Sequence, residues 1–194
     1  MSAPLAYLFW HWPASGIDRA PYEDALRGFH TALGRAGSVS FRIAARAPPF
    51  PGAGEPLYLD WYPVIDWADL GLLNAVAVSD ARRAPHDSVA AMAGGGHGEV
   101  RAWLRGTAPP HEASTARWSA KPTGTSYEDH LATLDGALEP RDALWQRQMV
   151  LGVAPELCVL SSGYEPPLSR ISTGARGDPV LVTRLEGVAG CPGG

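Results

Sequence analysis

Hydrophobic residues recur at helical spacing in two stretches of the chain, 20–36 and 127–138. Each stretch spaces four apolar side chains by four, three and four residues, which places them on one face of an α-helix. These side chains are Tyr22, Leu26, Phe29 and Leu33 in the first stretch, and Tyr127, Leu131, Leu134 and Leu138 in the second. Both helices are expected to bury these faces, and Gly37 is expected to end the first.

The two stretches also share the triplet Tyr-Glu-Asp, at 22–24 and at 127–129. A tryptophan and a proline precede each triplet, and Pro21 suits the first turn of the first helix. Thr125 and Glu128 have the spacing of a capping box at the start of the second. Two ordinary amphipathic helices could share the triplet by chance. The interpretation that we favour is an internal repeat of about 100 residues, too long a period for a solenoid.

Alternating or continuous short apolar runs predict eight β-strands. The predicted strands are 5–12, 38–46, 57–62, 99–106, 115–121, 143–152, 156–163 and 178–187. Asp66 is expected to cap a helix over 67–78, and 84–93 is also expected to be helical. The run GGGHG at 94–98 is interpreted as a helix stop. Two prolines in the segment 164–176 exclude a comparable second helix in the second half.

The order of these elements predicts an α+β fold made of two ferredoxin-like units. Residues 1–108 form the first unit, with the order strand, helix, strand, strand, helix, strand. The segment 109–114 is the expected joint. Residues 113–188 form a shortened copy, and 189–194 are expected to be a flexible tail.

With this element order and repeat, the chain resembles the dimeric α/β-barrel superfamily, in which two antiparallel ferredoxin-like sheets pack into a barrel, usually from two chains. The opening FWHWP, at 9–13, is most similar to the EthD-like and small-molecule-biosynthesis branches of that group. The resemblance covers nearly the whole chain and implies a single-chain pseudo-dimer that is a monomer or a weak homodimer. It also implies that small, often aromatic molecules bind between sheet and helices, and we expect the pocket in the more complete first half.

Composition narrows the class of protein. The 194 residues are 45% hydrophobic and 19% charged, which is typical of a soluble globular protein. The net charge of −4 gives no reason to expect a nucleic-acid partner. No apolar run is long enough for a membrane partner, and no signal peptide is recognised, so a cytoplasmic location is expected. The abundance of Ala, Gly and Pro, with Lys121 as the only lysine, is typical of GC-rich bacterial genomes.

Known catalytic motifs are missing from the sequence. It has no phosphate-binding loop, dinucleotide fingerprint, nucleophile elbow or zinc-protease motif. Cys158 and Cys191 are far apart and form no metal-binding pair. Cys158 is expected to be a buried small apolar residue, and Cys191 to lie in a loose tail. No metal and no cofactor are therefore expected, and the sequence by itself does not name a reaction.

His11 is the first candidate catalytic residue. It lies between Trp10 and Trp12 on a predicted strand, and an imidazole titrates near the pH at which proton transfer is useful. Alternation along the strand places His11 on the face opposite both tryptophans, so only one of these sets can face a pocket. The alternative is a partly buried strand histidine that binds backbone.

Asp60 is the second candidate catalytic residue. It shares a strand face with Tyr58 and Tyr62, while Leu59 and Trp61 face the other way. A carboxylate between two tyrosines could take an acidic proton from a phenol or an activated C–H group. The alternative is the exposed face of an edge strand.

Seven further residues are candidates for binding a substrate: Trp10, Trp12, His30, Arg42, Tyr58, Tyr62 and His86. His30 lies at the margin of the first apolar helix face, and Arg42 could hold an anionic group. His86 precedes Asp87 at a position that also suits a helix start. His130 is expected to face solvent.

The sequence thus leaves three functions open. The first is a cofactor-independent enzyme that acts on an aromatic or polyketide-like secondary metabolite, as a cyclase, isomerase, dehydratase or monooxygenase. The second is a non-catalytic small-molecule-binding or accessory protein. The third is a haem-binding oxidative enzyme, because the superfamily includes such relatives, although no motif marks one of the six histidines as an iron ligand.

Overall fold

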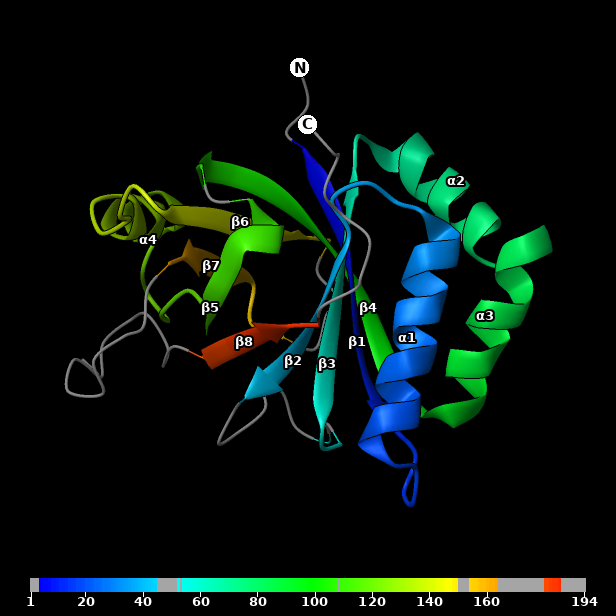
Figure 1. The fold of residues 1–194 in the computed structure, drawn as a ribbon. Helices are drawn as coiled ribbons and strands as arrows, with labels where there is room; N and C mark the ends of the chain where they lie inside the picture. The colour runs from blue at the N-terminus through cyan, green and yellow to red at the C-terminus, as the bar shows by residue number, and fades with distance from the viewer. Residues whose placement is uncertain are drawn as a thin grey trace.

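Eight antiparallel strands close into one barrel, and helices pack against its outer surface (Figure 1). The structure is a computed structural model that describes residues 4–44, 52, 54–107, 109–149, 154–163 and 180–185. The described elements are β1 (Leu5–Pro13), α1 (Arg19–Leu33), β2 (Val39–Ala44), β3 (Leu57–Val64), α2 (Trp67–Ala77), α3 (Asp80–Met92), β4 (Ala93–Gly106), the short 3₁₀ helix η1 (Pro110–Glu112), β5 (Ala113–Ser119), α4 (Tyr127–Asp135), β6 (Asp142–Gln148), β7 (Leu157–Ser162) and β8 (Val180–Arg184).

The strand order is β1-β3-β2-β8-β5-β7-β6-β4, and the last strand pairs with the first. The first four strands therefore lie in the order β4-β1-β3-β2, and the last four in the equivalent order β8-β5-β7-β6. Pairing of β2 with β8 and of β4 with β6 joins the two sets. The predicted α+β class and antiparallel α/β barrel are confirmed. The two predicted sheets are not separate. The edge strand β2 forms hydrogen bonds with β8, and the edge strand β4 forms hydrogen bonds with β6.

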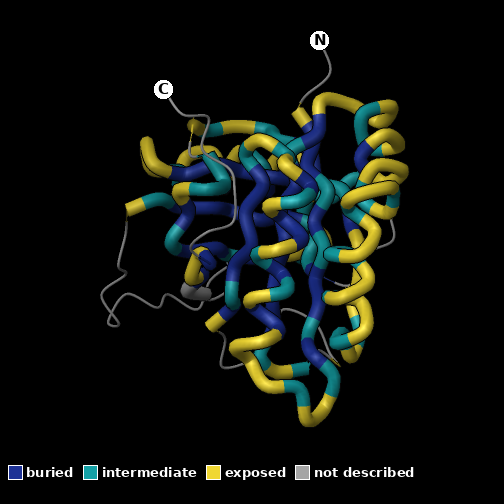
Figure 2. Tube along the Cα trace, turned by 45° about the vertical axis from the view of Figure 1, so that its right-hand side comes forward, coloured by how far each residue is buried: buried dark blue, intermediate teal, exposed yellow. Residues whose placement is uncertain are grey.

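The interior of the barrel is filled by large apolar side chains. Trp10 packs against Trp118, and Trp61 against Trp145, each pair with ring centroids 5.1 Å apart. Cys158 is buried as expected, and burial raises the pKa of its thiol to about 12, so it is unreactive as a nucleophile. Figure 2 shows the buried strands in dark blue and the outward faces of the helices in yellow.

An ion pair also lies inside the barrel, and the sequence pattern did not predict it. Arg101 Nε donates to Glu99 Oε1 at 2.9 Å, and Trp10 Nε1 donates to the same oxygen at 3.2 Å. Arg101 also donates to the carbonyl oxygens of Pro155 and Glu156, at 2.6 and 3.2 Å. A buried charge needs such partners, because its hydration is lost.

Helix α1 buries the face that its spacing predicts, since Tyr22, Leu26, Phe29 and Leu33 are all buried. The helix ends before Gly37, however. Gly34 adopts a left-handed conformation with φ 62°, and its N–H donates to the carbonyl of His30. A glycine tolerates this conformation without strain, so it forms the C-terminal cap.

Helix α4 differs from α1 more than the shared triplet predicts. Tyr22 is fully buried, whereas Tyr127 is 47% exposed, and Leu134 is the fully buried leucine of the α4 stripe. His130 is buried, which contradicts its expected solvent-facing position. The N-cap is Ser126, whose Oγ accepts the Asp129 N–H at 3.0 Å, so the predicted box at Thr125 and Glu128 is wrong.

Strand β4 begins earlier than predicted. Asp66 caps α2 as expected, by accepting the Asp69 N–H at 2.9 Å, and α3 extends over Asp80–Met92. Helix α3 does end just before the run 94–98, but the run itself belongs to β4, which was expected to begin only at residue 99. Its glycines leave room for aromatic rings of β1, because a Cβ on Gly96 would lie 2.6 Å from Phe9 Cζ.

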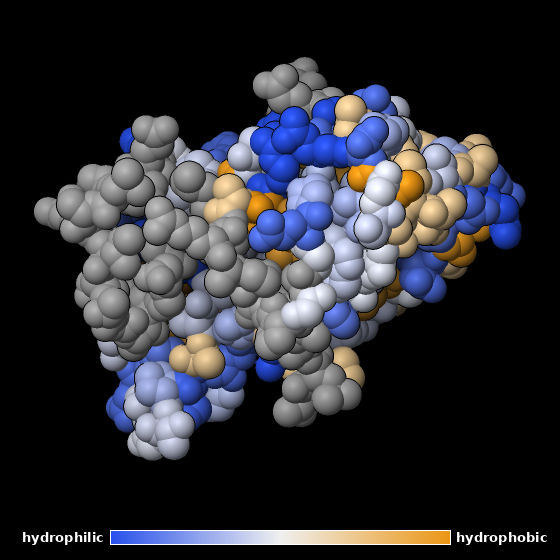
Figure 3. All heavy atoms as spheres, turned by 90° about the horizontal axis from the view of Figure 1, so that it is seen from below, coloured by the Kyte–Doolittle hydropathy of each residue, from blue (hydrophilic) through white to orange (hydrophobic). Residues whose placement is uncertain are grey.

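Some expectations fall on residues that the structure does not describe. These are the ends of the predicted strand 178–187, the loop 164–176, the tail 189–194 and Cys191. Among the described residues, no helix is long and apolar enough to cross a bilayer. Figure 3 views the molecule from below, where hydrophilic and hydrophobic residues are interspersed on the described surface.

Replacing Leu26 with alanine is expected to lower the free energy of unfolding by about 2–5 kcal/mol. Leu26 is 1% exposed and packs against the outer face of the barrel, so the change removes buried contacts and leaves a cavity. Leu72→Ala on α2 is the matched control, since Leu72 is 64% exposed and should change the stability by less than about 0.5 kcal/mol. Urea denaturation measures both, and equal effects would contradict the packing of α1.

Candidate functional site

A cavity of about 540 Å³ lies between the outer face of the barrel and helices α1, α2 and α3. Its volume is in the usual range for small-molecule sites. The apolar lining residues are Phe9, Leu26, Phe29, Leu33, Leu70, Leu73, Ala77, Val78, Val89, Ala90 and Ala93. The polar side chains of the lining are Tyr7, His11, Tyr22, Asp60, Tyr62, Asn74 and His86. The cavity is thus an apolar chamber with a few polar groups, in the half of the chain where a pocket was expected.

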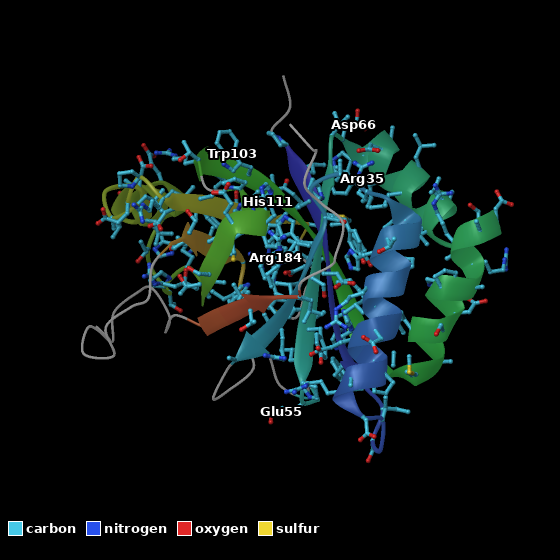
Figure 4. The ribbon with its side chains drawn as sticks, in the orientation of Figure 1. Arg35, Glu55, Asp66, Trp103, His111 and Arg184 are labelled. Atoms are coloured by element: carbon cyan, nitrogen blue, oxygen red, sulfur yellow. The ribbon has the colours of Figure 1, made fainter. Side chains whose placement is uncertain are left out.

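A second hollow, of about 1080 Å³, lies beside α2. Arg35 and Asp69 are the charged side chains among its described lining residues, and they bind each other. Figure 4 shows Arg35 near the start of α2, close to Asp66. Since these charges neutralise each other, this hollow offers no group for proton transfer.

The floor of the first cavity is formed by two adjacent strands, β1 and β3. Their register pairs Tyr7 with Tyr62, Phe9 with Asp60, and His11 with Tyr58. The His11 ring contacts Phe9 along β1 and Tyr58 across on β3, each with a centroid distance of 5.5 Å and a nearly parallel plane. The packing of these rings fixes the orientation of the imidazole.

The two tryptophans that flank His11 lie away from this cavity. Trp10 is fully buried in the barrel interior, and Trp12 packs against the same interior cluster. Alternation along β1 is the reason, because it sends both tryptophans to the face opposite His11. The expectation that Trp10 and Trp12 line the substrate site is therefore corrected.

A chain of short contacts connects His11 to both helix and sheet. Its Nδ1 lies 2.6 Å from the hydroxyl of Tyr22 on α1, and its Nε2 lies 3.3 Å from Asp60 Oδ1 on β3. On the other side of the carboxylate, the Tyr62 hydroxyl donates to Asp60 Oδ2 at 2.7 Å, and His30 Nε2 lies 3.2 Å from the same oxygen. One buried carboxylate is thus held between two imidazoles.

These contacts set the ionisation of the group. Burial alone would raise the pKa of Asp60, but the charges and hydrogen bonds of His30 and His11 outweigh burial and hold it well below the usual range. Burial, and then the negative charge of Asp60, raise the pKa of Tyr22 and of Tyr62. Asp60 is therefore a carboxylate at neutral pH, and both tyrosines are protonated phenols.

The arrangement supports proton transfer at His11. The tautomer with its proton on Nε2 turns that proton towards the carboxylate of Asp60, 3.3 Å away, and leaves Nδ1 to accept from the Tyr22 hydroxyl; this assignment rests on the charge of Asp60 and on the 2.6 Å contact at Nδ1. Asp60 stabilises the imidazolium that forms when His11 takes a proton. Tyr22, which also lines the cavity, can pass a proton between His11 and a bound molecule.

Of the remaining candidate binding residues, Tyr62 and His86 line the cavity. His30 is not among the lining residues, but its Nε2 lies 3.2 Å from Asp60 Oδ2. Tyr58 and Arg42 are not among the lining residues. The hydroxyl of Tyr58 donates to Glu23 Oε1 at 3.0 Å, and Arg42 Nη1 donates to the same oxygen at 3.2 Å. The expected contact of Arg42 with an anionic ligand is thus replaced by a contact with an internal carboxylate.

The sequence pattern indicated that Tyr22 is buried on α1, but not that its hydroxyl meets His11. The signal was a tyrosine in the first turn of an otherwise apolar helix face, where a hydroxyl must find a partner when buried. Asn74 was also missed, because nothing in the pattern distinguishes it from a surface residue of α2. Among the described residues, no group of three His, Cys, Asp or Glu side chains is arranged to hold a metal ion.

Comparison with known proteins gives evidence on the fold only. No family model and no curated protein matches the chain. A solved structure described as a "putative chlorite dismutase" aligns over 95% of this chain and 96% of its own, with a TM-score of 0.51 at 8% identity. The fold is a ferredoxin-like α/β barrel. A "putative monooxygenase" from Lactobacillus acidophilus aligns over 94% of both chains, with a TM-score of 0.49 at 12% identity.

Proposed function

We propose that this protein is a cofactor-independent enzyme that moves protons on a small aromatic or polyketide-like molecule held in the cavity under α1, α2 and α3. One observation carries the proposal: His11, only 1% exposed, bridges Asp60 and Tyr22 at the wall of that cavity. Buried titratable groups with specific charged partners in a cleft are typical of catalytic sites. The apolar lining suits the carbon skeleton of the substrate.

In this proposal, His11 is the base and Asp60 stabilises its protonated form. Tyr22 relays the proton to or from a hydroxyl or an activated C–H group of the substrate. Such steps are sufficient for a cyclase, an isomerase or a dehydratase. A monooxygenase at the same site would begin with the same deprotonation of the substrate.

Hydrogen–deuterium exchange tests the proposal without knowledge of the natural substrate. The wild-type protein in D₂O is expected to accelerate exchange of the acidic ring protons of naphthoresorcinol, measured by proton NMR. His11→Ala should remove this acceleration, because the base is lost. His111→Ala is the control, since His111 lies on η1 away from α1 and α3 (Figure 4). Equal acceleration by the wild type and by His11→Ala would refute the proposal.

A non-catalytic binding protein is the second candidate, and the predominantly apolar lining favours it. Such a protein would hold its ligand by the same aromatic walls, while the His11 network would serve only to satisfy buried polar groups. Binding of naphthoresorcinol without any acceleration of exchange would support this candidate.

Haem is the remaining alternative, and the residues of the cavity fit it incompletely. His11 Nδ1 contacts the Tyr22 hydroxyl and His11 Nε2 lies 3.3 Å from Asp60, so His86 is the lining histidine whose Nε2 has no such neighbour among the described residues. None of the described lining residues is an arginine or a lysine that could bind the haem carboxylates. Titration with hemin is expected to give no Soret band, and a band lost in His86→Ala would overturn that expectation.

We also infer that the chain is a pseudo-dimer that arose by tandem duplication, in the manner of the EthD-like proteins. The equivalent strand orders β4-β1-β3-β2 and β8-β5-β7-β6 support this inference, together with the repeated Tyr-Glu-Asp triplet. The different burial of Tyr22 and Tyr127 marks divergence between the halves. Because one chain closes the barrel, a second copy is not needed to complete the sheet.

A further inference from the structure

The polar groups that line the cavity differ in how deeply they are buried. His11, Tyr22 and Asp60 are all buried and form its inner end. Asn74 on α2 and His86 on α3 also line it, but Asn74 is exposed and the His86 side chain keeps 36% of its surface accessible. Their accessibility places these two residues on the solvent side of the cavity, one on α2 and the other on α3.

The geometry of α1 gives the separation of the two places. His86 packs edge-on against Phe29, with ring centroids 5.8 Å apart. Phe29 follows Tyr22 by seven residues on α1, which corresponds to roughly 10 Å along the helix axis. Between these places the floor is formed by Tyr7 and Phe9, whose rings are stacked with an interplanar angle of 19°. A flat molecule of bicyclic or tricyclic size spans this length.

The side chains at the opening have unused hydrogen-bonding capacity. His86 Nδ1 lies 3.0 Å from Asp87 Oδ1, and the tautomer that donates from Nδ1 to this carboxylate has Nε2 as an acceptor. The amide of Asn74 can both donate and accept. Within the described part of the chain, neither the Asn74 amide nor His86 Nε2 has a protein partner.

The charges around the cavity point to an uncharged ligand. The described lining includes the carboxylate of Asp60 but no arginine or lysine. An anionic group on the ligand would lose its hydration on binding and would find no such cation as compensation. A hydroxyl or a carbonyl can be satisfied by neutral groups such as an amide and an imidazole.

We propose that Asn74 and His86 form a second recognition point, which binds a hydroxyl or carbonyl at the outer end of an uncharged, planar ligand. The inner end of the same ligand meets Tyr22 and His11, so the inference rests on the proposed function and adds a specificity rule to it. Molecules with oxygen at both ends should bind better than molecules with oxygen at one end only.

Three related probes test the rule by fluorescence titration. The wild-type protein is expected to bind 2,6-dihydroxynaphthalene about tenfold more tightly than 2-naphthol, which is the usual contribution of one added hydrogen bond. It should also bind 2,6-dihydroxynaphthalene more tightly than 6-hydroxy-2-naphthoate, whose outer group is a carboxylate. Tighter binding of the carboxylate would overturn the requirement for an uncharged ligand.

Substitutions at the opening give the second part of the test. Asn74→Leu and His86→Leu should each reduce the tenfold preference for 2,6-dihydroxynaphthalene over 2-naphthol. Ser88→Ala on the exposed face of α3 is the control and should keep the preference. A preference that persists in both leucine variants overturns the inference even if His11→Ala abolishes exchange. Loss of the preference in a protein that catalyses no exchange would refute the enzyme and retain the recognition point.

Discussion

Replacing Asp60 with asparagine is expected to slow the exchange of naphthoresorcinol protons by about 10²–10⁴-fold. Asparagine has nearly the same shape but no negative charge, so it cannot stabilise the imidazolium that forms when His11 takes a proton. The carboxylate lies 3.3 Å from His11 Nε2, where its charge acts directly on the base. NMR in D₂O measures the rate, and circular dichroism checks that the variant is folded.

Asn74→Leu is the comparison for Asp60→Asn, because it changes the opening of the cavity and leaves His11, Tyr22 and Asp60 in place. It should affect affinity rather than the rate at saturating probe. If Asp60→Asn exchanged protons as fast as the wild type, the carboxylate would have only a structural role.

Asp60→Asn should also change how the stability of the protein depends on pH. The pKa of Asp60 is well below its ordinary value of 3.8 in the folded protein. A carboxyl whose pKa falls on folding stabilises the protein above its unfolded-state pKa, and this contribution is lost as the pH falls below that value. Urea midpoints measured at pH 7 and near pH 3 should therefore differ more for the wild type than for Asp60→Asn.

Trp61→Ala is expected to lower the free energy of unfolding by about 3–5 kcal/mol. Trp61 is fully buried inside the barrel, where its ring contacts Trp145, so its loss leaves a large cavity in the barrel interior. Trp67→Ala is the matched control, because Trp67 is 51% exposed at the start of α2. Chemical denaturation should show a large shift of the midpoint for Trp61→Ala alone.

Trp61 also tests the division between the inner and outer faces of β3. Asp60 and Tyr62 face the cavity, whereas Trp61 faces the barrel interior. The exchange rate per folded molecule should therefore be preserved in Trp61→Ala under stabilising conditions. A selective loss of exchange with little loss of stability would contradict this division.

Simple alternation predicted the central part of the site. On β1 and β3 every second side chain points to the same face, so a correct strand assignment was sufficient to separate His11 and Asp60 from the tryptophans. Whether the two residues would meet was not predictable, since it depends on the register of two strands that are far apart in sequence. That register pairs Phe9 with Asp60 and places His11 on the diagonal.

Other features depend on interactions that a linear pattern does not contain. The contact of Tyr22 with His11 requires α1 to fold back over β1. The run 94–98 forms a strand because its glycines accommodate neighbouring rings, whereas local propensity favours a turn there. The pairing of β2 with β8 joins residues more than a hundred positions apart, and it decides that the barrel is one closed sheet.

Both strand sets of the barrel belong to one polypeptide, and this has a consequence for how the protein can change. In a barrel made from two identical chains, every substitution appears twice, so a mutation that enlarges a cavity under the helices of one chain enlarges the equivalent cavity in the other. Here each substitution appears once. Among the described residues, the hollow beside α4 holds only about 10 Å³, and Leu134, Leu144 and Leu157 pack on that side. Selection can therefore keep one side as a rigid support while it reshapes the chamber on the other.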